Sequence, residues 1–178
     1  MNLLQTIWSV LITPNESLIR VFSIPLIIIE AIVGTLLFTT ILNIEYTPKK
    51  KWSFIVILSI LSFFSNYILP APYGTILHML IVPFLIHFIF KTSAIKSIVA
   101  SLLPSTISAL LDTIISKTYL SIFDITYDIA IYTPIHRIAI TLIIYSTILL
   151  FTLLAKHFHL NIYIFDDLTH KNKRSSHI

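Results

Sequence analysis

Two acidic residues lie inside long apolar stretches, and their side chains are the ones best suited to chemistry in this sequence. Glu30 follows the run SIPLIII, and Asp112 follows STISALL. A charged side chain at the centre of a bilayer costs about 2.5–3.5 kcal/mol on insertion scales, so such acids commonly belong to functional sites. The cost falls when the acid pairs with a cation or takes up a proton. Each acid is therefore either part of a ligand site or a polar lock between helices.

The nearby cations suggest how these acids are accommodated. Lys117 follows Asp112 by five residues, and Arg137 begins a later apolar stretch, so both are candidate partners of Asp112. Glu30 lies ten residues after Arg20, and no cation is within reach along its own stretch, so protonation or a hydroxyl partner is expected. We predict that both acids face the interior of a helix bundle. With Arg137 they form the candidate ligand-binding set, and the alternative is a purely structural role.

The sequence lacks the motifs that usually carry enzymatic chemistry. It has no His-Glu-x-x-His, no Gly-x-Ser-x-Gly and no glycine-rich phosphate loop. It has no cysteine, which excludes disulfides, thiolate metal sites and cysteine nucleophiles. His78 and His87 are nine residues apart on one predicted helix, so they point to opposite faces and cannot share a metal. We expect no catalytic residue, no metal and no cofactor, and no enzymatic activity.

The apolar stretches place the chain in the membrane. Of its 178 residues, 56% are hydrophobic and 11% are charged, and the mean hydropathy is +0.92. Soluble domains contain about 25% charged residues, so the composition indicates an all-α, polytopic membrane helix bundle. The net charge of +4 is expected to face anionic headgroups of the lipid bilayer and not nucleic acid.

Five stretches are predicted to span the bilayer, and one shorter stretch is not. The five are Leu18–Leu42, Trp52–Leu69, Tyr73–Phe90, Ser97–Ser116 and Arg137–Lys156. Met1–Ile12 is too short to span and is expected to form an interfacial helix at the amino terminus. The segment from Lys117 to Pro134 is expected outside the membrane, with a short amphipathic helix. Residues 1–158 thus form the transmembrane domain, and residues 159–178 form a short polar tail.

The distribution of basic residues predicts the orientation. Nine of the twelve lysines and arginines fall on one side of this topology: Lys49, Lys50, Lys51, Lys91, Lys96, Lys156, Lys171, Lys173 and Arg174. Short loops rich in basic residues stay in the cytoplasm, so this side is predicted to be cytoplasmic. We therefore expect a multi-pass protein of the cell membrane with a cytoplasmic carboxyl terminus. The turn Pro70–Gly74 is then external.

Small polar residues form a stripe along the fourth predicted span. The stripe comprises Ser97, Ser101, Ser105, Ser108, Asp112 and Ser116, which at 100° per residue fall within an arc of about 100°. Small hydroxyl residues allow helices to approach closely in a membrane. The stripe is therefore predicted to be a buried seam, with its serines more buried than Leu102, Leu103 or Ile107.

The chain resembles the amino-terminal membrane sensor region of a family of histidine kinases. The phrases that carry the resemblance are MNLLQTIW followed by TPNE, LPAPYG, FIFKTSAIKSI and LLDTIISKTY, within about residues 1–165. The family comprises the peptide-pheromone-sensor-like kinases of Gram-positive bacteria, with ATPase domains of the GHKL superfamily. The resemblance implies a bacterial two-component signal-transduction protein. The chain contains neither a phospho-acceptor histidine box nor an ATP-lid motif, so we expect a sensor without phosphotransfer activity, either truncated or free-standing.

The sequence is compatible with two functions. The first is a membrane-embedded signal-sensing module, with a peptide or small molecule as the signal and a second copy or a kinase as the protein partner. The alternative is a small membrane transporter subunit, such as a substrate-binding component that needs an ATPase. A neighbouring kinase or regulator gene would favour sensing, and a neighbouring ATPase pair would favour transport.

Overall fold

The computed structural model describes residues 5, 9, 11–13, 16–70 and 72–160, and this part of the chain is helical without strands. Its helices are α2 (Glu16–Ile41), α3 (Pro48–Tyr67), α4 (Tyr73–Phe90), α5 (Ala94–Phe123), α6 (Tyr127–Tyr132) and α7 (Pro134–His157). The all-helical prediction is confirmed. The interfacial helix predicted for Met1–Ile12 falls mostly outside the described residues, as does the tail beyond Leu160.

Local sequence signals set the ends of several helices. The Thr47 hydroxyl accepts a hydrogen bond from the backbone of residue 50, and Pro48 follows it at the first position of α3. Ser93 caps α5 in the same way. Lys91 and Asp124 adopt left-handed conformations, with φ of 55° and 49°, and end α4 and α5. The observed bounds of α4 are those predicted from the sequence.

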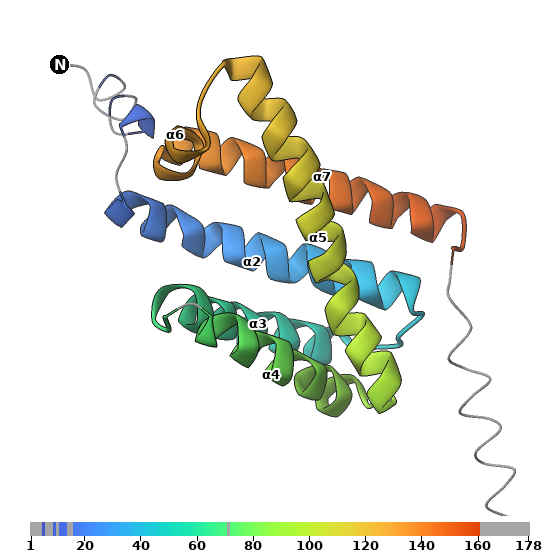
Figure 1. Ribbon diagram of the computed structural model, residues 1–178. Helices are drawn as coiled ribbons and strands as arrows, with labels where there is room; N and C mark the ends of the chain where they lie inside the picture. The colour runs from blue at the N-terminus through green and yellow to red at the C-terminus, as the bar shows by residue number, and fades with distance from the viewer. Residues whose placement is uncertain (1–4, 6–8, 10, 14–15, 71, 161–178) are drawn as a thin grey trace, which may run out of the picture.

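Helix α2 lies at the centre of the bundle (Figure 1). It packs against α7 on one side, against α3 on the other, and against α5, which crosses it obliquely. Helices α3 and α4 form an antiparallel hairpin, and the short helix α6 packs against α7. Helix α5 contacts α4 near its beginning and α7 further along, so it connects the two sides of the bundle.

Four helices of the described part are long and apolar enough to cross a membrane. Their candidate spans are Ile19–Ile41, Tyr73–Phe90, Ala94–Phe123 and Pro134–His157. Helix α3 is not among them, because its 20 residues include three lysines in the first turn and Asn66 and Tyr67 at the end. The predicted fifth span is a helix, but its crossing of the membrane stays a prediction.

Helix α5 is longer than the sequence suggested. The prediction ended this helix at Ser116, whereas it continues to Phe123 because neither proline nor glycine follows Pro104 before Pro134. Its 30 residues measure about 45 Å, which exceeds the roughly 30 Å of hydrocarbon in a bilayer. The oblique course of α5 in Figure 1 agrees with a helix that tilts to fit.

Three phenylalanines join α2, α3 and α4 near one end of the bundle. The ring centroids of Phe38 and Phe54 are 5.7 Å apart, those of Phe38 and Phe90 are 5.8 Å apart, and those of Phe54 and Phe90 are 5.2 Å apart. All three pairs are edge-to-face, a geometry that contributes about 0.5–1.5 kcal/mol per pair beyond burial. Phe54 is completely buried. We call this group the phenylalanine triad.

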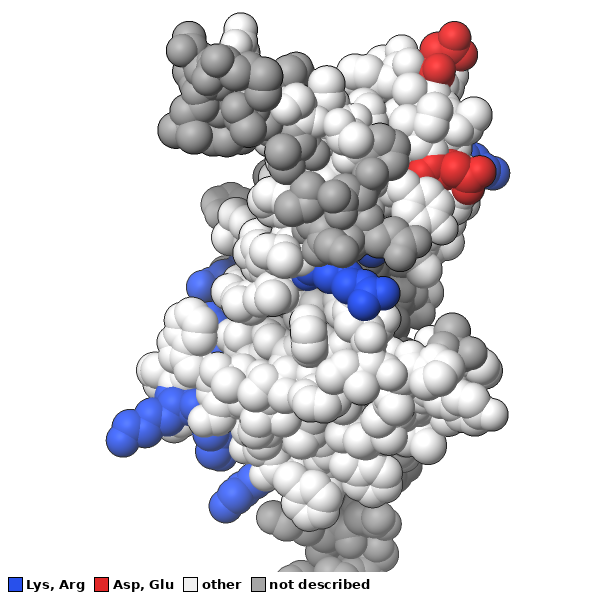
Figure 2. All heavy atoms as spheres, turned by 90° about the vertical axis from the view of Figure 1, so that its left-hand side faces the viewer, with Lys and Arg blue, Asp and Glu red and all other residues white. Residues whose placement is uncertain are grey.

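The outer surface is mostly apolar, as expected for helices surrounded by lipid. Phe88 and Ile122, for example, are 72% and 71% exposed. Figure 2 shows a broad uncharged surface, with acidic side chains near its upper right and basic side chains at its centre and lower left. A soluble monomer rarely exposes contiguous apolar surface of this extent, which supports a membrane location.

Basic residues gather at one end of the bundle, where α2, α4 and α7 end and α3 and α5 begin (Figure 1). We call it the lysine end, and its members are Lys49, Lys50, Lys51, Lys91, Lys96 and Lys156. Arg20 and Arg137 lie near the helix ends at the opposite end. Lysines distant in sequence thus come together in space, as the predicted topology requires.

Glycine is needed where α4 begins. A Cβ atom added to Gly74 would lie 1.9 Å from the backbone oxygen of Ser65 in α3. The side chain of Ser65 is itself buried, so α3 has no space at this point to move away. A Cβ atom added to Gly34 in α2 would instead lie 3.5 Å from Pro104, an ordinary contact. Position 34 therefore has space for a side chain, whereas position 74 does not.

We predict that Gly74→Ala destabilises the hairpin by about 1–3 kcal/mol, because the new methyl group must displace backbone. Gly34→Ala is the matched control and is expected to be neutral or stabilising by up to about 1 kcal/mol, since alanine favours a helix. Thermal unfolding of the purified variants in detergent measures both effects. Equal midpoints for the two variants would contradict the close approach at Gly74.

Candidate functional site

A small cavity of about 70 Å³ lies between the helices at the level of Glu30. Its polar lining comes from five helices and consists of Glu30, Ser62, His78, Ser101, Ser105, Ser108 and Tyr145. The remaining lining is apolar and includes Phe54 of the phenylalanine triad. We call it the central cavity. Its volume and polar wall suit a few water molecules.

Tyr145 of α7 is the partner of Glu30. Its side chain makes a polar contact with the Glu30 carboxyl group, and Ser108 of α5 makes another with Tyr145. Asp112, one helical turn beyond Ser108 on α5, lies within electrostatic range of Tyr145. The tyrosine hydroxyl therefore stands between the two acids that the sequence singled out, and it joins α2, α5 and α7 through polar contacts.

A second cavity, of about 190 Å³, lies between α5, α6 and α7 towards the end opposite the lysine end. Its lining residues are Asp112, Ser116, Leu120, Tyr127, Ala130, Ile131, Arg137, Ile140 and Thr141. We call it the outer cavity. The Ser116 hydroxyl donates a hydrogen bond of 2.9 Å to Asp112 Oδ1. Arg137 is half-buried, and no ion pair joins its guanidinium group to a described side chain.

The structure therefore separates the predicted site residues into two places. Asp112 and Arg137 line the outer cavity, whereas Glu30 lines the central cavity. Both acids line cavities between helices and have polar partners, as predicted, but neither residue is fully enclosed. The cavities are open, so each acid keeps accessible surface on a cavity wall. Ion pairing of Asp112 with Lys117 or Arg137 is also not observed, and Ser116 takes that place.

The predicted serine seam is mostly wrong. Ser97 is buried, but Ser105 is exposed, whereas Leu103 and Ile107 are half-buried and pack against the core. The hydroxyls of Ser97, Ser101 and Ser105 donate to backbone oxygens about one turn earlier, as Ser105 does to the carbonyl oxygen of Ser101 at 3.1 Å. Since these hydroxyls are already satisfied, no neighbouring helix has to approach them. Three of the serines line the central cavity instead.

The two histidines of α4 make polar contacts within the fold. His78 Nε2 lies 3.2 Å from the Ser62 hydroxyl and joins α4 to α3, which confirms the predicted polar contact between helices. His87 Nδ1 interacts with the backbone oxygen of Thr92 just beyond its own helix. Within the described ranges, no group of three or more histidines, aspartates or glutamates is placed to hold a metal ion.

Tyr145 is the site residue that sequence reasoning missed. Charged side chains and histidines stand out in an apolar sequence, whereas a tyrosine within TLIIYSTILL looks like any aromatic residue of an apolar helix. Its spacing from Arg137 gives a signal, since the two are eight residues apart and so lie on the same face of a helix. The face that carries Arg137 to the outer cavity thus carries Tyr145 to the central cavity.

We predict that Tyr145→Phe destabilises the protein by about 1–3 kcal/mol, because the Glu30 carboxyl group loses its hydroxyl partner inside the bundle. In a Glu30→Ala background the same change should cost much less, since the shared interaction has already gone. Tyr73→Phe is the control, because Tyr73 is 67% exposed at the start of α4. Denaturant unfolding in detergent gives the four values, and strict additivity would contradict the Glu30–Tyr145 contact.

The two cavities differ in what they can bind. The central cavity offers one carboxyl group and several hydroxyls, which suit water or a small hydrogen-bonding group. The outer cavity offers a carboxylate from α5 and a guanidinium group from α7, which suit a ligand that carries both charges. Comparison of the chain with known protein families, with curated proteins and with solved structures gives no match.

Proposed function

We propose that this protein is a membrane-embedded signal-sensing module whose ligand binds in the outer cavity. The observation that carries the proposal is that Asp112 and Arg137 line one cavity without forming an ion pair with each other. Arg137 is half-buried and has no ion-pair partner among the described side chains. A ligand that supplies a carboxylate to Arg137 would satisfy it.

The charges of the outer cavity favour a zwitterionic ligand. Arg137 presents a planar set of donors that matches a carboxylate, and Asp112 accepts hydrogen bonds from an ammonium group. Apolar side chains such as Leu120 and Ile140 complete the wall. A free amino acid or a short peptide with both termini unmodified has this combination. The resemblance to peptide-sensing kinases supports the same ligand class.

The contacts around Tyr145 offer a route for the signal. Asp112 lies within electrostatic range of Tyr145, and Tyr145 makes polar contacts with Glu30 and Ser108. A ligand that neutralises Asp112 would change the electrostatic environment of the Tyr145 hydroxyl and therefore its contact with Glu30. Because α7 runs from the outer cavity to the lysine end, a shift of α7 against α2 would carry the change across the bundle.

The same proposal includes the finer topology. Helix α3 spans the membrane as the fifth crossing, the lysine end faces the cytoplasm, and the carboxyl terminus is cytoplasmic. The grouping of six lysines at one end supports this orientation, because basic residues are retained on the cytoplasmic side. Helix α3 is the antiparallel partner of α4 in the hairpin, so a crossing by α4 favours one by α3.

Single cysteines test this topology in a chain that has none of its own. On intact cells, a membrane-impermeant thiol reagent is expected to label Tyr73→Cys and not Lys50→Cys. After permeabilisation both should react, which serves as the control for accessibility. Labelling of Lys50→Cys alone on intact cells would reverse the orientation, and labelling of both would mean that α3 does not cross.

A transporter subunit is the second candidate function. It is favoured by the polar central cavity, because transporters hold their substrates near the bilayer midplane. Its Glu30 is the kind of acid that takes part in ion or proton coupling. A sensor retains its ligand on one side, whereas a transporter moves it across. Uptake of a radiolabelled ligand into proteoliposomes therefore distinguishes the two functions, and uptake would favour transport.

We predict that a panel of free amino acids and short unmodified peptides contains ligands that raise the unfolding temperature of the purified protein. A ligand at 100 times its Kd stabilises by about 2.7 kcal/mol. Asp112→Asn and Arg137→Gln should each weaken binding at least about tenfold, because each removes a charge-assisted hydrogen bond. Acetylation of the ligand's amino terminus or amidation of its carboxyl terminus should have a comparable effect.

Asp128→Asn is the matched control for these variants. Asp128 is an exposed acid in α6, next to Tyr127 of the outer cavity, but its own side chain does not line that cavity. Its removal changes the net charge as Asp112→Asn does and should leave binding unchanged. Ligand binding that survives in both cavity variants would remove the outer cavity from consideration.

A further inference from the structure

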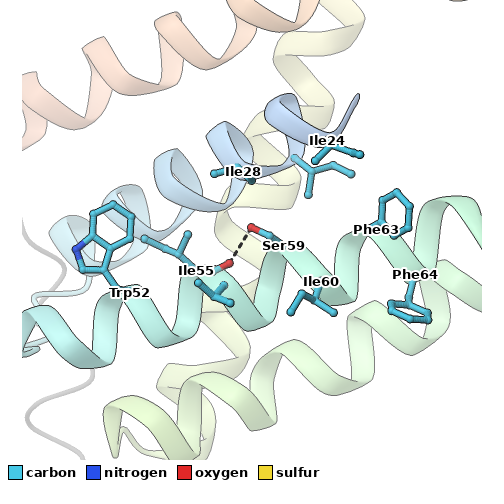
Figure 3. Close-up of a pocket in the computed structure, with 10 residues that line it drawn as sticks. Ile24, Ile28, Trp52, Ile55, Ser59, Ile60, Phe63 and Phe64 are labelled. Atoms are coloured by element: carbon cyan, nitrogen blue, oxygen red, sulfur yellow. Dashed lines mark hydrogen bonds between the residues drawn. The ribbon is translucent and has the colours of Figure 1, made fainter. Parts of the chain in front are cut away.

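A long apolar groove runs along the outside of the bundle between α2 and α3, with a volume of about 490 Å³ (Figure 3). Its wall consists of isoleucine, valine and phenylalanine side chains, with Trp52 at one end and Phe63 and Phe64 at the other. Ser59 is its only hydroxyl residue, and that hydroxyl donates a 2.8 Å bond to the carbonyl oxygen of Ile55. Apart from the indole N–H of Trp52 at one end, the groove therefore offers only hydrocarbon contact along its length.

The length of the groove corresponds to one leaflet of a bilayer. The residues from Trp52 to Phe64 advance by 12 positions (64 − 52), which is about 18 Å along a helix. Half of a hydrocarbon core of roughly 30 Å is about 15 Å. Apolar side chains such as Val56 and Ile60, each 55% exposed, face outward along this length. One extended acyl chain would cover them.

The end of the groove at Trp52 is positively charged. Lys49 precedes Trp52 by three residues, so it lies on the same side of α3, one turn nearer the helix end. Lys49 is exposed, as is Trp52, an aromatic residue of the kind found at headgroup level. Lys50 and Lys51 follow, and the preceding loop contributes a single acid, Glu45. An anionic group is therefore favoured where the groove meets the membrane surface.

We propose that this groove is a binding site for an anionic phospholipid of the leaflet at the lysine end. One acyl chain occupies the groove between α2 and α3, and the phosphate group lies against Lys49 beside the Trp52 ring. The site is separate from both polar cavities and does not depend on the proposed sensing function. Its pairing of an apolar groove with a basic mouth favours a phospholipid over a helix of a second copy.

Trp52 provides a direct probe of the site. The chain contains only two tryptophans, so Trp8→Phe leaves Trp52 as the single fluorophore. The full chain is placed in phosphatidylcholine vesicles, and equal fractions of brominated phosphatidylglycerol or brominated phosphatidylcholine are added. The anionic lipid is expected to quench Trp52 with about fivefold higher apparent affinity, since each basic residue near the surface favours anionic lipid by about that factor. Equal quenching by the two lipids would overturn the proposal.

Two variants, each with a control, distinguish binding of the lipid headgroup from binding of the acyl chain in the groove. Lys49→Gln should reduce the preference about fivefold, whereas Lys91→Gln, an equal loss of charge at the same end, should leave it unchanged. Ser59→Phe fills the groove and should reduce quenching by both lipids, while Ser146→Phe on the exposed face of α7 should not. The same loss of preference in both lysine variants would indicate only a general surface charge. Protection of Trp52 from both lipids, with a crosslinked dimer, would assign the groove to a second copy instead.

Discussion

The phenylalanine triad is the contact on which the arrangement of this bundle depends. Phe38, Phe54 and Phe90 come from three different helices and meet in edge-to-face pairs at the lysine end. In a bilayer, helices gain little from simple burial of apolar surface, because lipid is equally apolar. Shape-specific contacts must therefore hold them together, and aromatic pairs supply both contact area and preferred geometry. The triad attaches the α3–α4 hairpin to α2 at a single level.

The opposite end of the bundle is more open. Helix α5 diverges from the hairpin as it crosses α2, and its second half contacts α7 instead (Figure 1). This divergence leaves the outer cavity between α5, α6 and α7, and the central cavity lies between it and the triad. Tyr119 closes part of the gap through a 3.0 Å contact with His136. A bundle packed closely at one end and open at the other is suited to accept a ligand from one side.

Among the residues that the structure describes, polar groups are satisfied mainly by hydroxyls and by their own helices, not by ion pairs. Thr35 and Thr39 are buried and donate to carbonyl oxygens one turn earlier. Glu30 is met by Tyr145, and Asp112 by Ser116. A neutral hydroxyl partner accommodates an acid without bringing a second charge into the membrane, which would add its own desolvation cost. Under the proposed function, it also leaves Arg137 available for a ligand.

Much of the fold was determined by the sequence. The apolar composition required a helical membrane bundle, because only helices satisfy their backbone groups within one apolar segment. The Pro70–Gly74 turn predicted the start of α4 and Lys91 its end, and the lysine-rich segments marked one end of the bundle. The sequence predicts too short a helix for α5, because Lys117 marks the membrane surface but a lysine there does not break a helix.

The candidate site depended on the tertiary structure. The sequence identified Glu30, Asp112 and Arg137, but the division of these residues between two cavities follows from the crossing of α5 over α2. That crossing brings Pro104 against Gly34, and no periodicity in either helix encodes the angle between them. The role of Tyr145 likewise depends on the tertiary structure. The Tyr145 hydroxyl reaches Glu30 only because α7 packs beside α2.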